Sequence, residues 1–284
     1  MNSPKVLYVP QGSINKIITH LGERKLDVST LDAFAMRFIG YPQHGWIEFE
    51  STHVSHADFL YALSNQKAAM VSITLIPGET SYFFLNDLAA KFHLSPSRLQ
   101  KALESYSPYL EGMFVPDTYK LPMGITEERA IKLLLHPSKV KMKQWSEKIF
   151  GTYDEAKWFQ YVTLASIIQK EAASVEDMPM VSSVIYNRLK KGMKLQMDGT
   201  LNYGKYSHDK ITSKRIKQDD SAYNTYKVSG LPEQPVCNVG LDAIKAAIFP
   251  AKTEYLYFVK GKDGKHHYSS YYSTHMKNIQ GATK

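Results

Sequence analysis

Near the N-terminus, the spacing of the apolar residues is first that of a β-strand, then that of two helices, and then that of a strand again. Residues 6–9 have the pattern of a short strand, and residues 46–49 have that of a strand that returns beside it. Between them, Ser13 is placed as the N-cap of one helix, and a second helix starts at Ser29 and ends at Gly40. The apolar positions of the two helices are Ile14, Ile17, Ile18 and Leu21, then Leu31, Phe34 and Phe38. The pattern predicts a strand, two helices and a closing strand.

The same order of elements recurs further along the chain. Residues 72–76 predict a strand that ends at Pro77, and a helix follows from Thr80. Pro96 then opens another helix, because proline is well placed at the first helical position. The recurrence lies in pattern more than in identity, and it predicts two similar α+β units.

From residue 108 onward the pattern is mainly helical. It predicts helices over residues 126–135, 138–150, 156–175, 180–191 and 240–248, the first two separated by Pro137. Two strand patterns around a turn at residues 261–264 then predict a β-hairpin. A join near residue 110 therefore separates a repeat-containing α+β region from a larger C-terminal region.

Composition excludes several classes of protein. The 284 residues are 43% hydrophobic and 22% charged, which excludes collagen-like, mucin-like and wholly disordered chains. Cys237 is the one cysteine, which excludes an internal disulfide framework and a cysteine-based zinc cluster. No apolar run approaches the ~20 residues that span a bilayer, and residues 1–4 open no signal peptide. The chain as given is expected to be soluble.

The chain is basic, with 35 Lys and Arg against 27 Asp and Glu and a net charge of +8. Such a balance favours anionic surroundings: nucleic acid, phospholipid headgroups or an acidic polymer. The basic residues are scattered rather than concentrated in one run, so solubilisation is the simpler explanation. Charge alone identifies no partner.

One carboxylate stands within an apolar stripe of the helix predicted at 156–175. The residues that precede it on the same helix face are Leu164, Ile167 and Ile168. Aliphatic neighbours would desolvate Glu171 and raise its pKa, which gives the protonated form that a general acid needs near neutral pH. The alternative is a glutamate at the edge of the stripe, paired with Lys170 or Arg188. Periodicity alone leaves both interpretations open and favours the second.

Other chemical motifs are weak or missing. His266 and His267 are adjacent, but no carboxylate or cysteine cluster stands near them at metal-ligand spacing. The sequence has no phosphate-binding loop, no dinucleotide glycine motif and no Gly-x-Ser-x-Gly motif, and Cys237 lacks the signature of a nucleophile. No metal and no cofactor is therefore expected.

Eight strings of residues stand in order along most of the chain. They occupy residues 111–119, 164–171, 184–189, 195–198, 224–226, 230–232, 246–252 and 255–259. Together they resemble the endolytic murein transglycosylases of bacteria, the YceG-like family, with matching order and spacing from about residue 70 to residue 279. Two positions depart from residues frequent in the family: Met113 replaces a tryptophan, and residues 197–199 replace Thr-Asp-Pro.

The resemblance implies a particular domain organisation within an α+β fold. LysM-like βαα modules at the N-terminus are followed by a larger, helix-rich α+β catalytic domain with a C-terminal β-hairpin. The implied limits are residues 1–68 for an N-terminal α+β unit with the weaker LysM-like pattern, 69–107 for a LysM-like module and 108–284 for the YceG-like catalytic domain.

The resemblance also implies an activity. The family cleaves the β-1,4 bond between N-acetylmuramic acid and N-acetylglucosamine within glycan strands and forms 1,6-anhydro-muramyl ends without using water. Its catalytic glutamate follows a lysine in the string matched here by Lys170 and Glu171. Glu171 is therefore expected to serve as general acid and general base. One carboxyl suffices because the muramyl C6 hydroxyl is the nucleophile, whereas ordinary glycosidases use two carboxyls.

Polar residues in the other matching strings are expected to bind substrate: Gln196, Asp198, Asn224, Tyr226 and His266. His266 is preferred to His267 because it stands nine residues before His275, the spacing of two histidines in the family. Asn187 and Arg188 either belong to the site or hold a pair of helices together, and the sequence leaves both open.

Location and partners also follow from the resemblance. The family is usually fixed to the inner membrane by one N-terminal helix, with its catalytic domain in the periplasm. That helix is missing here, so the chain is expected to be the soluble part of a single-pass protein that meets the membrane only through this anchor. Expected partners are peptidoglycan glycan strands and peptidoglycan synthases of the elongation or division machinery, and nucleic acid is not expected. The alternative is a non-catalytic peptidoglycan-binding or scaffold protein of the cell-wall synthesis machinery.

Overall fold

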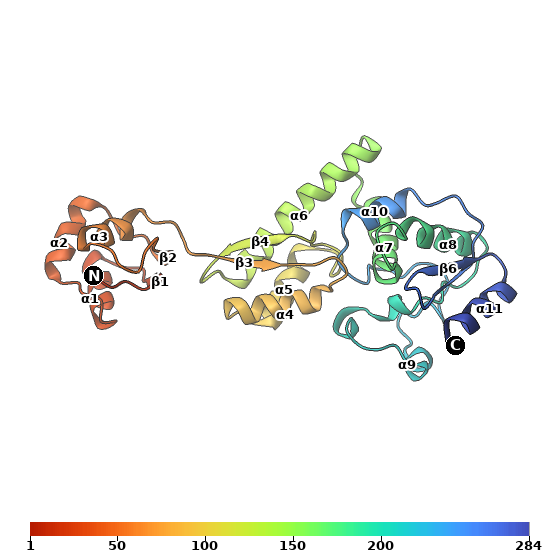
Figure 1. The fold of residues 1–284 in the computed structure, drawn as a ribbon. Helices are drawn as coiled ribbons and strands as arrows, with labels where there is room; N and C mark the ends of the chain where they lie inside the picture. The colour runs from red at the N-terminus through yellow and green to blue at the C-terminus, as the bar shows by residue number, and fades with distance from the viewer. Residues whose placement is uncertain (284) are drawn as a thin grey trace. The chain divides into compact units, whose positions relative to one another are not determined.

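The structure, a computed structural model, describes residues 1–283 as two compact units (Figure 1). One unit contains residues 1–73 and 119–130, and the other contains residues 74–118 and the chain from residue 131 onward. Helices combine with two-stranded sheets, which confirms the predicted α+β class. The predicted domain limits at residues 68 and 107 rest on the resemblance and stay a prediction.

The first unit has the predicted order of strand, helix, helix and strand. The strand β1 (Val6–Val9) is followed along the chain by α1 (Ile14–Glu23), α2 (Thr30–Ile39), β2 (Gly45–Glu48) and α3 (His56–Asn65). The two strands pair antiparallel. Its buried core includes Val9, Ile17, Leu21, Met36, Ile47, Phe49, Phe59 and Leu63.

The apolar stripe of α2 lies on the outer side of the helix rather than in the core. Its members are Leu31, Phe34 and Phe38, exposed by 78%, 58% and 78%. Met36 is the large α2 residue that is buried. Asp32 orients the helix, because its carboxylate accepts the backbone N–H of Ser29 and binds His56 of α3. The contacts of Asp32 thus determine which face of α2 points inward, and the spacing of the apolar residues does not reveal them.

The second strand–helix–helix pattern is also present. β3 (Met70–Thr74) pairs with β4 (Thr118–Pro122), and α4 (Ser81–Phe92) and α5 (Pro96–Tyr106) lie between them in sequence. Glu111 joins α4 to a distant part of the chain, because its carboxylate accepts the Ser81 backbone N–H and hydroxyl and the Asn238 amide. Burial raises the pKa of Glu111 to about 8, against the lowering effect of the hydrogen bonds from Ser81.

Pro137 does not divide the next helix, contrary to the prediction. α6 runs without interruption over Glu127–Phe150. Proline removes one intrahelical hydrogen bond, but Ser138 fixes the turn at this point. The Ser138 hydroxyl donates to the Leu134 carbonyl at 2.8 Å and accepts the Val115 N–H at 3.0 Å.

A buried helix lies at the centre of the second unit. α7 (Glu155–Glu171) packs against α8 (Met178–Lys190) and α10 (Leu241–Ile248) (Figure 1). It also packs against the 3-10 helix η1 (Asp198–Leu201). α7 ends at Glu171, earlier than predicted, because Ala172 takes an extended conformation with φ −65° and ψ 138°. The carboxyl of Glu171 therefore lies at the C-terminal end of α7.

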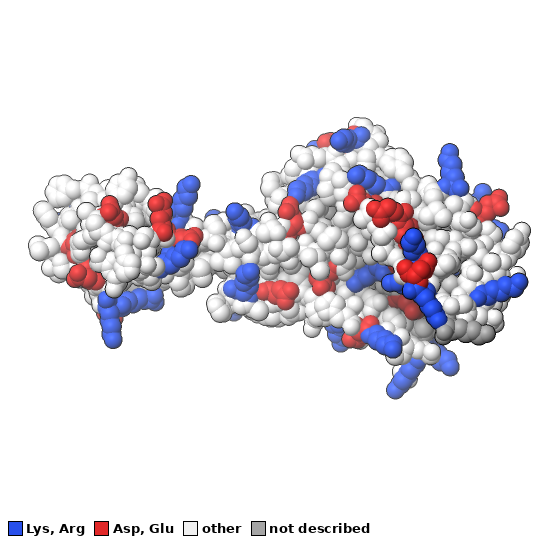
Figure 2. All heavy atoms as spheres, in the orientation of Figure 1, with Lys and Arg blue, Asp and Glu red and all other residues white. Residues whose placement is uncertain are grey.

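Short elements complete the chain. After η2 (Gly204–Tyr206) and α9 (Ser213–Gln218), β5 (Tyr257–Lys260) and β6 (His266–Ser269) form the predicted antiparallel hairpin, and α11 (Tyr272–Thr283) follows. None of the helices within residues 1–283 combines the length and the hydropathy that crossing a membrane requires. On the face drawn in Figure 2, basic side chains alternate with acidic ones, in keeping with the scattered charge of the sequence.

Candidate active site

Glu171 is the last residue of α7, and its side chain is half-buried. Ile167 and Ile168 in the preceding turn are fully buried. Burial, with a smaller effect from the charge of Asp198, raises the pKa of Glu171 to about 7. The C-terminal end of a helix also disfavours a negative charge. Glu171 can therefore give and take a proton near neutral pH, as a general acid and base must.

Neither basic residue considered as an ion-pair partner binds the Glu171 carboxyl. Lys170 Nζ donates to Ser207 Oγ at 2.7 Å, and Arg188 donates to main-chain carbonyls. Within residues 1–283 no cation lies within ion-pair distance of Glu171, and its hydrogen bond comes from a backbone amide. The geometry thus offers no support for the alternative of a paired glutamate at the edge of the stripe.

That backbone amide belongs to Gly199, at the start of η1. The Gly199 N–H donates to Glu171 Oε1 at 2.6 Å and opposes the rise of the Glu171 pKa. A Cβ atom at this position would lie 2.7 Å from Lys170 Cβ and 2.8 Å from Glu171 Oε1. In this chain the close approach of Gly199 to α7 therefore leaves no room for a Cβ atom. The sequence marked residue 199 only as a departure from the family pattern.

Asp198 and Tyr226 form a hydrogen-bonded pair next to Gly199. The Tyr226 hydroxyl donates to Asp198 Oδ1 at 2.8 Å. Burial, and then the neighbouring Asp198, raise the pKa of the Tyr226 phenol, so it remains a donor at neutral pH. The structure thus brings Asp198 and Tyr226 close to Glu171. Gln196 lies exposed in the same segment, in a left-handed conformation with φ 51°.

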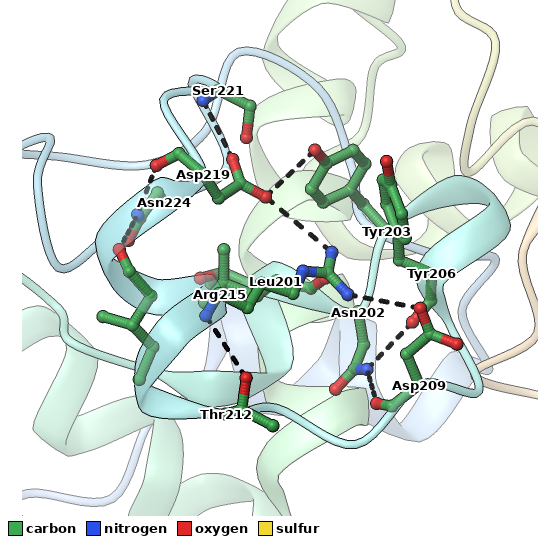
Figure 3. A network of polar contacts seen from close by, with 12 residues as sticks. Leu201, Asn202, Tyr203, Tyr206, Asp209, Thr212, Arg215, Asp219, Ser221 and Asn224 are labelled. Atoms are coloured by element: carbon green, nitrogen blue, oxygen red, sulfur yellow. Dashed lines mark hydrogen bonds and ion pairs between the residues drawn. The ribbon is translucent and has the colours of Figure 1, made fainter.

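Asn224 lies behind this group, fully buried. Its side-chain amide donates to the carbonyls of Ile216 at 2.8 Å and Asp219 at 2.7 Å (Figure 3). Its Oδ1 accepts the Tyr226 N–H at 3.1 Å. Asn224 therefore uses its side chain to shape the loop that carries Tyr226.

Arg215 closes the loop between η1 and Asn224, and nothing in the sequence pattern indicated this role. Its guanidinium lies 4.0 Å from the centre of the Tyr206 ring and donates to the Leu201 carbonyl at 2.5 Å. The Asp209 and Asp219 carboxylates lie 3.7 and 3.8 Å from its nitrogens (Figure 3). The loop beside the candidate site is thus folded around one cation.

His266 lies against the segment that follows Glu171. Its Nδ1–H donates to Asp177 at 2.7 Å, and the Tyr268 hydroxyl donates to the same carboxylate at 2.5 Å. Asp177 also accepts the Ala173 N–H at 3.0 Å, which ties this segment to β6. Within the described chain no hydrogen bond joins His266 to Asp198 or its tyrosine partner. Sequence reasoning missed Asp177, whose one signal is its place immediately before α8.

The described residues contain no group of three or more His, Cys, Asp or Glu side chains that could hold a metal ion. The polar groups of the candidate site are the carboxyl of Glu171, the Gly199 amide that donates to it and the Asp198–Tyr226 pair. Such a site fits proton transfer to and from one substrate.

Comparisons with known proteins place the chain in a family. The model of the YceG-like family matches residues 7–281, so the chain belongs to that family. A crystal structure of a putative yceG-like protein from Listeria monocytogenes has a TM-score of 0.63 and 25% identity, over 98% of this chain and 99% of that one.

Curated relatives carry a more specific name. An endolytic murein transglycosylase of Bacillus subtilis is 35% identical over 158 residues, which are 55% of this chain and 43% of the relative. One of Streptococcus pneumoniae serotype 2 is 32% identical over 176 residues, 60% of this chain and 32% of the relative. The matched part of the chain therefore spans less than half the length of these relatives.

Proposed function

We propose that the chain is an endolytic lytic transglycosylase that cleaves the β-1,4 bond between N-acetylmuramic acid and N-acetylglucosamine in peptidoglycan. The observation that carries the proposal is the Glu171 carboxyl, unpaired within residues 1–283 and with its pKa raised to about 7. Family membership and the names of the relatives from Bacillus subtilis and Streptococcus pneumoniae support the same activity.

The proposed reaction uses Glu171 twice. Protonated Glu171 donates its proton to the glycosidic oxygen as that oxygen leaves the anomeric carbon. The carboxylate then takes the proton of the muramyl C6 hydroxyl as the hydroxyl oxygen attacks the anomeric carbon. A C1–O6 bond replaces the glycosidic bond, Glu171 regains its proton, and no water is consumed. Gln196, Asp198, Asn224, Tyr226 and His266 are proposed to bind or shape the substrate site.

The test is mass spectrometry of purified peptidoglycan digested with the chain, with 1,6-anhydro-muramyl ends as the readout. Glu171→Gln keeps the shape of the side chain but cannot transfer the proton, so the rate should fall on the order of 10²–10⁴-fold. Glu176→Gln is the matched control, because Glu176 is exposed and lies beyond the end of α7. Binding of glycan strands should survive in both variants.

Two outcomes would contradict the proposal. A parental protein that binds strands and releases no anhydro ends would favour the alternative of a non-catalytic scaffold. A folded Glu171→Gln variant that works at the parental rate would exclude Glu171 as the catalyst.

β3, α4 and α5 have the strand–helix–helix order expected of a LysM-like module, and we propose that they bind glycan strands. Anchorage in the inner membrane, a periplasmic location and synthase partners stay predictions of the resemblance.

A further inference from the structure

Arg188 is a buried cation on α8 that is 8% exposed. Its Nε donates to the Leu256 carbonyl at 2.6 Å, and its Nη1 donates to the carbonyls of Leu195 at 2.7 Å and Lys194 at 3.1 Å. Gln196 Oε1 lies 3.5 Å from the same Nη1. Arg188 thus fixes consecutive residues of one short segment.

No carboxylate of the described chain is paired with Arg188, and burial lowers its pKa. A buried charge is costly unless hydrogen bonds replace the lost water. Here main-chain carbonyls and the face of the Tyr257 ring, 5.1 Å away, replace it. Its bonds with main-chain oxygens hold backbone geometry, which an apolar side chain of similar size could not do.

The segment that Arg188 holds has a strained residue at its centre. Gln196 has φ 51°, a conformation that residues other than glycine seldom adopt and that surrounding contacts must maintain. The Gln196 and Met197 N–H groups bond to Thr225, at 3.1 Å each. The backbone is therefore held from both sides immediately before Gly199.

The segment ends at the carboxyl of the candidate catalyst, where the Gly199 N–H donates to Glu171 Oε1 at 2.6 Å. We propose that Arg188 is a positioning residue, which holds residues 194–199 in the conformation that brings the Gly199 N–H to Glu171. An effect of Arg188 on turnover rests on the proposed function. The placement of the Gly199 amide by Arg188 does not depend on that function.

The neighbouring residue on α8 provides a matched control. The Asn187 side-chain amide donates to the carbonyls of Thr253 at 2.9 Å and Tyr255 at 3.0 Å. These contacts join α8 to the chain before β5 and do not reach residues 194–199. Asn187→Ala therefore removes main-chain hydrogen bonds of the same kind and leaves the segment in place.

The experiment compares Arg188→Lys with Asn187→Ala by two measurements. The first is the titration midpoint of Glu171, followed by carbon NMR of labelled carboxyl groups. Loss of the Gly199 hydrogen bond removes an interaction that favours the ionised form, so Arg188→Lys should move the midpoint upward, and Asn187→Ala should not. The second is the pH profile of anhydro-end release, whose high-pH limb should move to higher pH, with about a tenfold fall in kcat and little change in KM.

The two proposals fail in distinguishable ways. If the parental protein releases no anhydro ends, the proposed function fails, and the Glu171 titration still tests Arg188. An unchanged midpoint in folded Arg188→Lys, with only a lower melting temperature as in Asn187→Ala, overturns the positioning role. Should Arg188→Lys not fold, Gln196→Val replaces it, because a β-branched residue disfavours φ 51° at this exposed position. An unchanged midpoint in Gln196→Val equally overturns the proposal.

Discussion

Two segments meet at Glu171, and opposite chemistry fixes them. Residues 194–199 are held by Arg188, a cation that donates to carbonyls, whereas residues 172–177 are held by Asp177, a carboxylate that accepts N–H and O–H groups. The first segment donates a hydrogen bond to the Glu171 side chain, and the second continues the backbone beyond it. Damage to the first should therefore alter proton transfer, and damage to the second should mainly lower stability.

The largest effect expected from this comparison is that of Gly199→Ala. The new methyl group would lie 2.7 Å from Lys170 Cβ and 2.8 Å from Glu171 Oε1, so η1 and the carboxyl must separate. A displacement of about 1 Å in a catalytic group can lower the rate on the order of 10²-fold. Steady-state release of anhydro ends measures the change.

Gly281→Ala is the control for this prediction, because among the described residues no atom outside its chain neighbours and its own helix backbone lies within 4 Å of the position where its Cβ would be. It should retain the parental rate. A Gly199→Ala variant as active as Gly281→Ala would show that the amide contact has no part in turnover.

Asp177→Asn tests the second segment and should act mostly on stability. The amide cannot accept all of the hydrogen bonds from Ala173, His266 and Tyr268 that the carboxylate accepts. Hydrogen bonds to a charged group are worth about 1.5–3 kcal/mol, so the free energy of unfolding should fall by about 2 kcal/mol. Urea unfolding measures the loss, and turnover of the folded fraction should stay within about tenfold of the parent. A larger loss of turnover with unchanged stability would remove the distinction between the segments.

The smallest expected effect is a pH-dependent difference in stability between the parent and Glu171→Gln. The folded carboxyl has a pKa of about 7 against an ordinary value of 4.5, so the folded state binds the extra proton between these values. The parental free energy of unfolding should therefore fall, relative to the variant, as pH rises from about 4.5 to about 7. Because the carboxyl is only half-buried, we expect a difference on the order of 1–2 kcal/mol. Urea unfolding at several pH values would give parallel curves if Glu171 were an ordinary exposed glutamate.

The order of elements could be predicted from the sequence, because strand and helix spacing and the cap residues are local signals. Which face of a helix points inward is not local, and α2 shows the difference. Its exposed Phe34 and Phe38 have core-like spacing, whereas contacts of Asp32 with another helix fix its orientation. Pro137 shows the same limit, because Ser138 stabilises the turn through a residue distant in sequence.

The candidate catalyst could be identified from its apolar stripe and its matching string, although the stripe extends less far than predicted. α7 ends at Glu171, and Val175, the next position at that spacing, is 51% exposed. The Gly199 amide could not be predicted, because a backbone donor has no side-chain signature. Asp177 also escaped notice, since its partner His266 lies on a distant hairpin.

The surroundings of Cys237 make the chain suitable for site-specific labelling. The thiol is fully buried, its Sγ lies 3.5 Å from the Ser166 carbonyl oxygen, and burial raises its pKa. Since thiolates are the reactive form and the sequence has no second cysteine, the native protein should resist maleimide reagents. A cysteine introduced at the exposed side chain of Lys194 would then be the sole accessible thiol. A fluorophore or spin label there would report whether the 194–199 segment moves when glycan strands are added, without removal of the native cysteine.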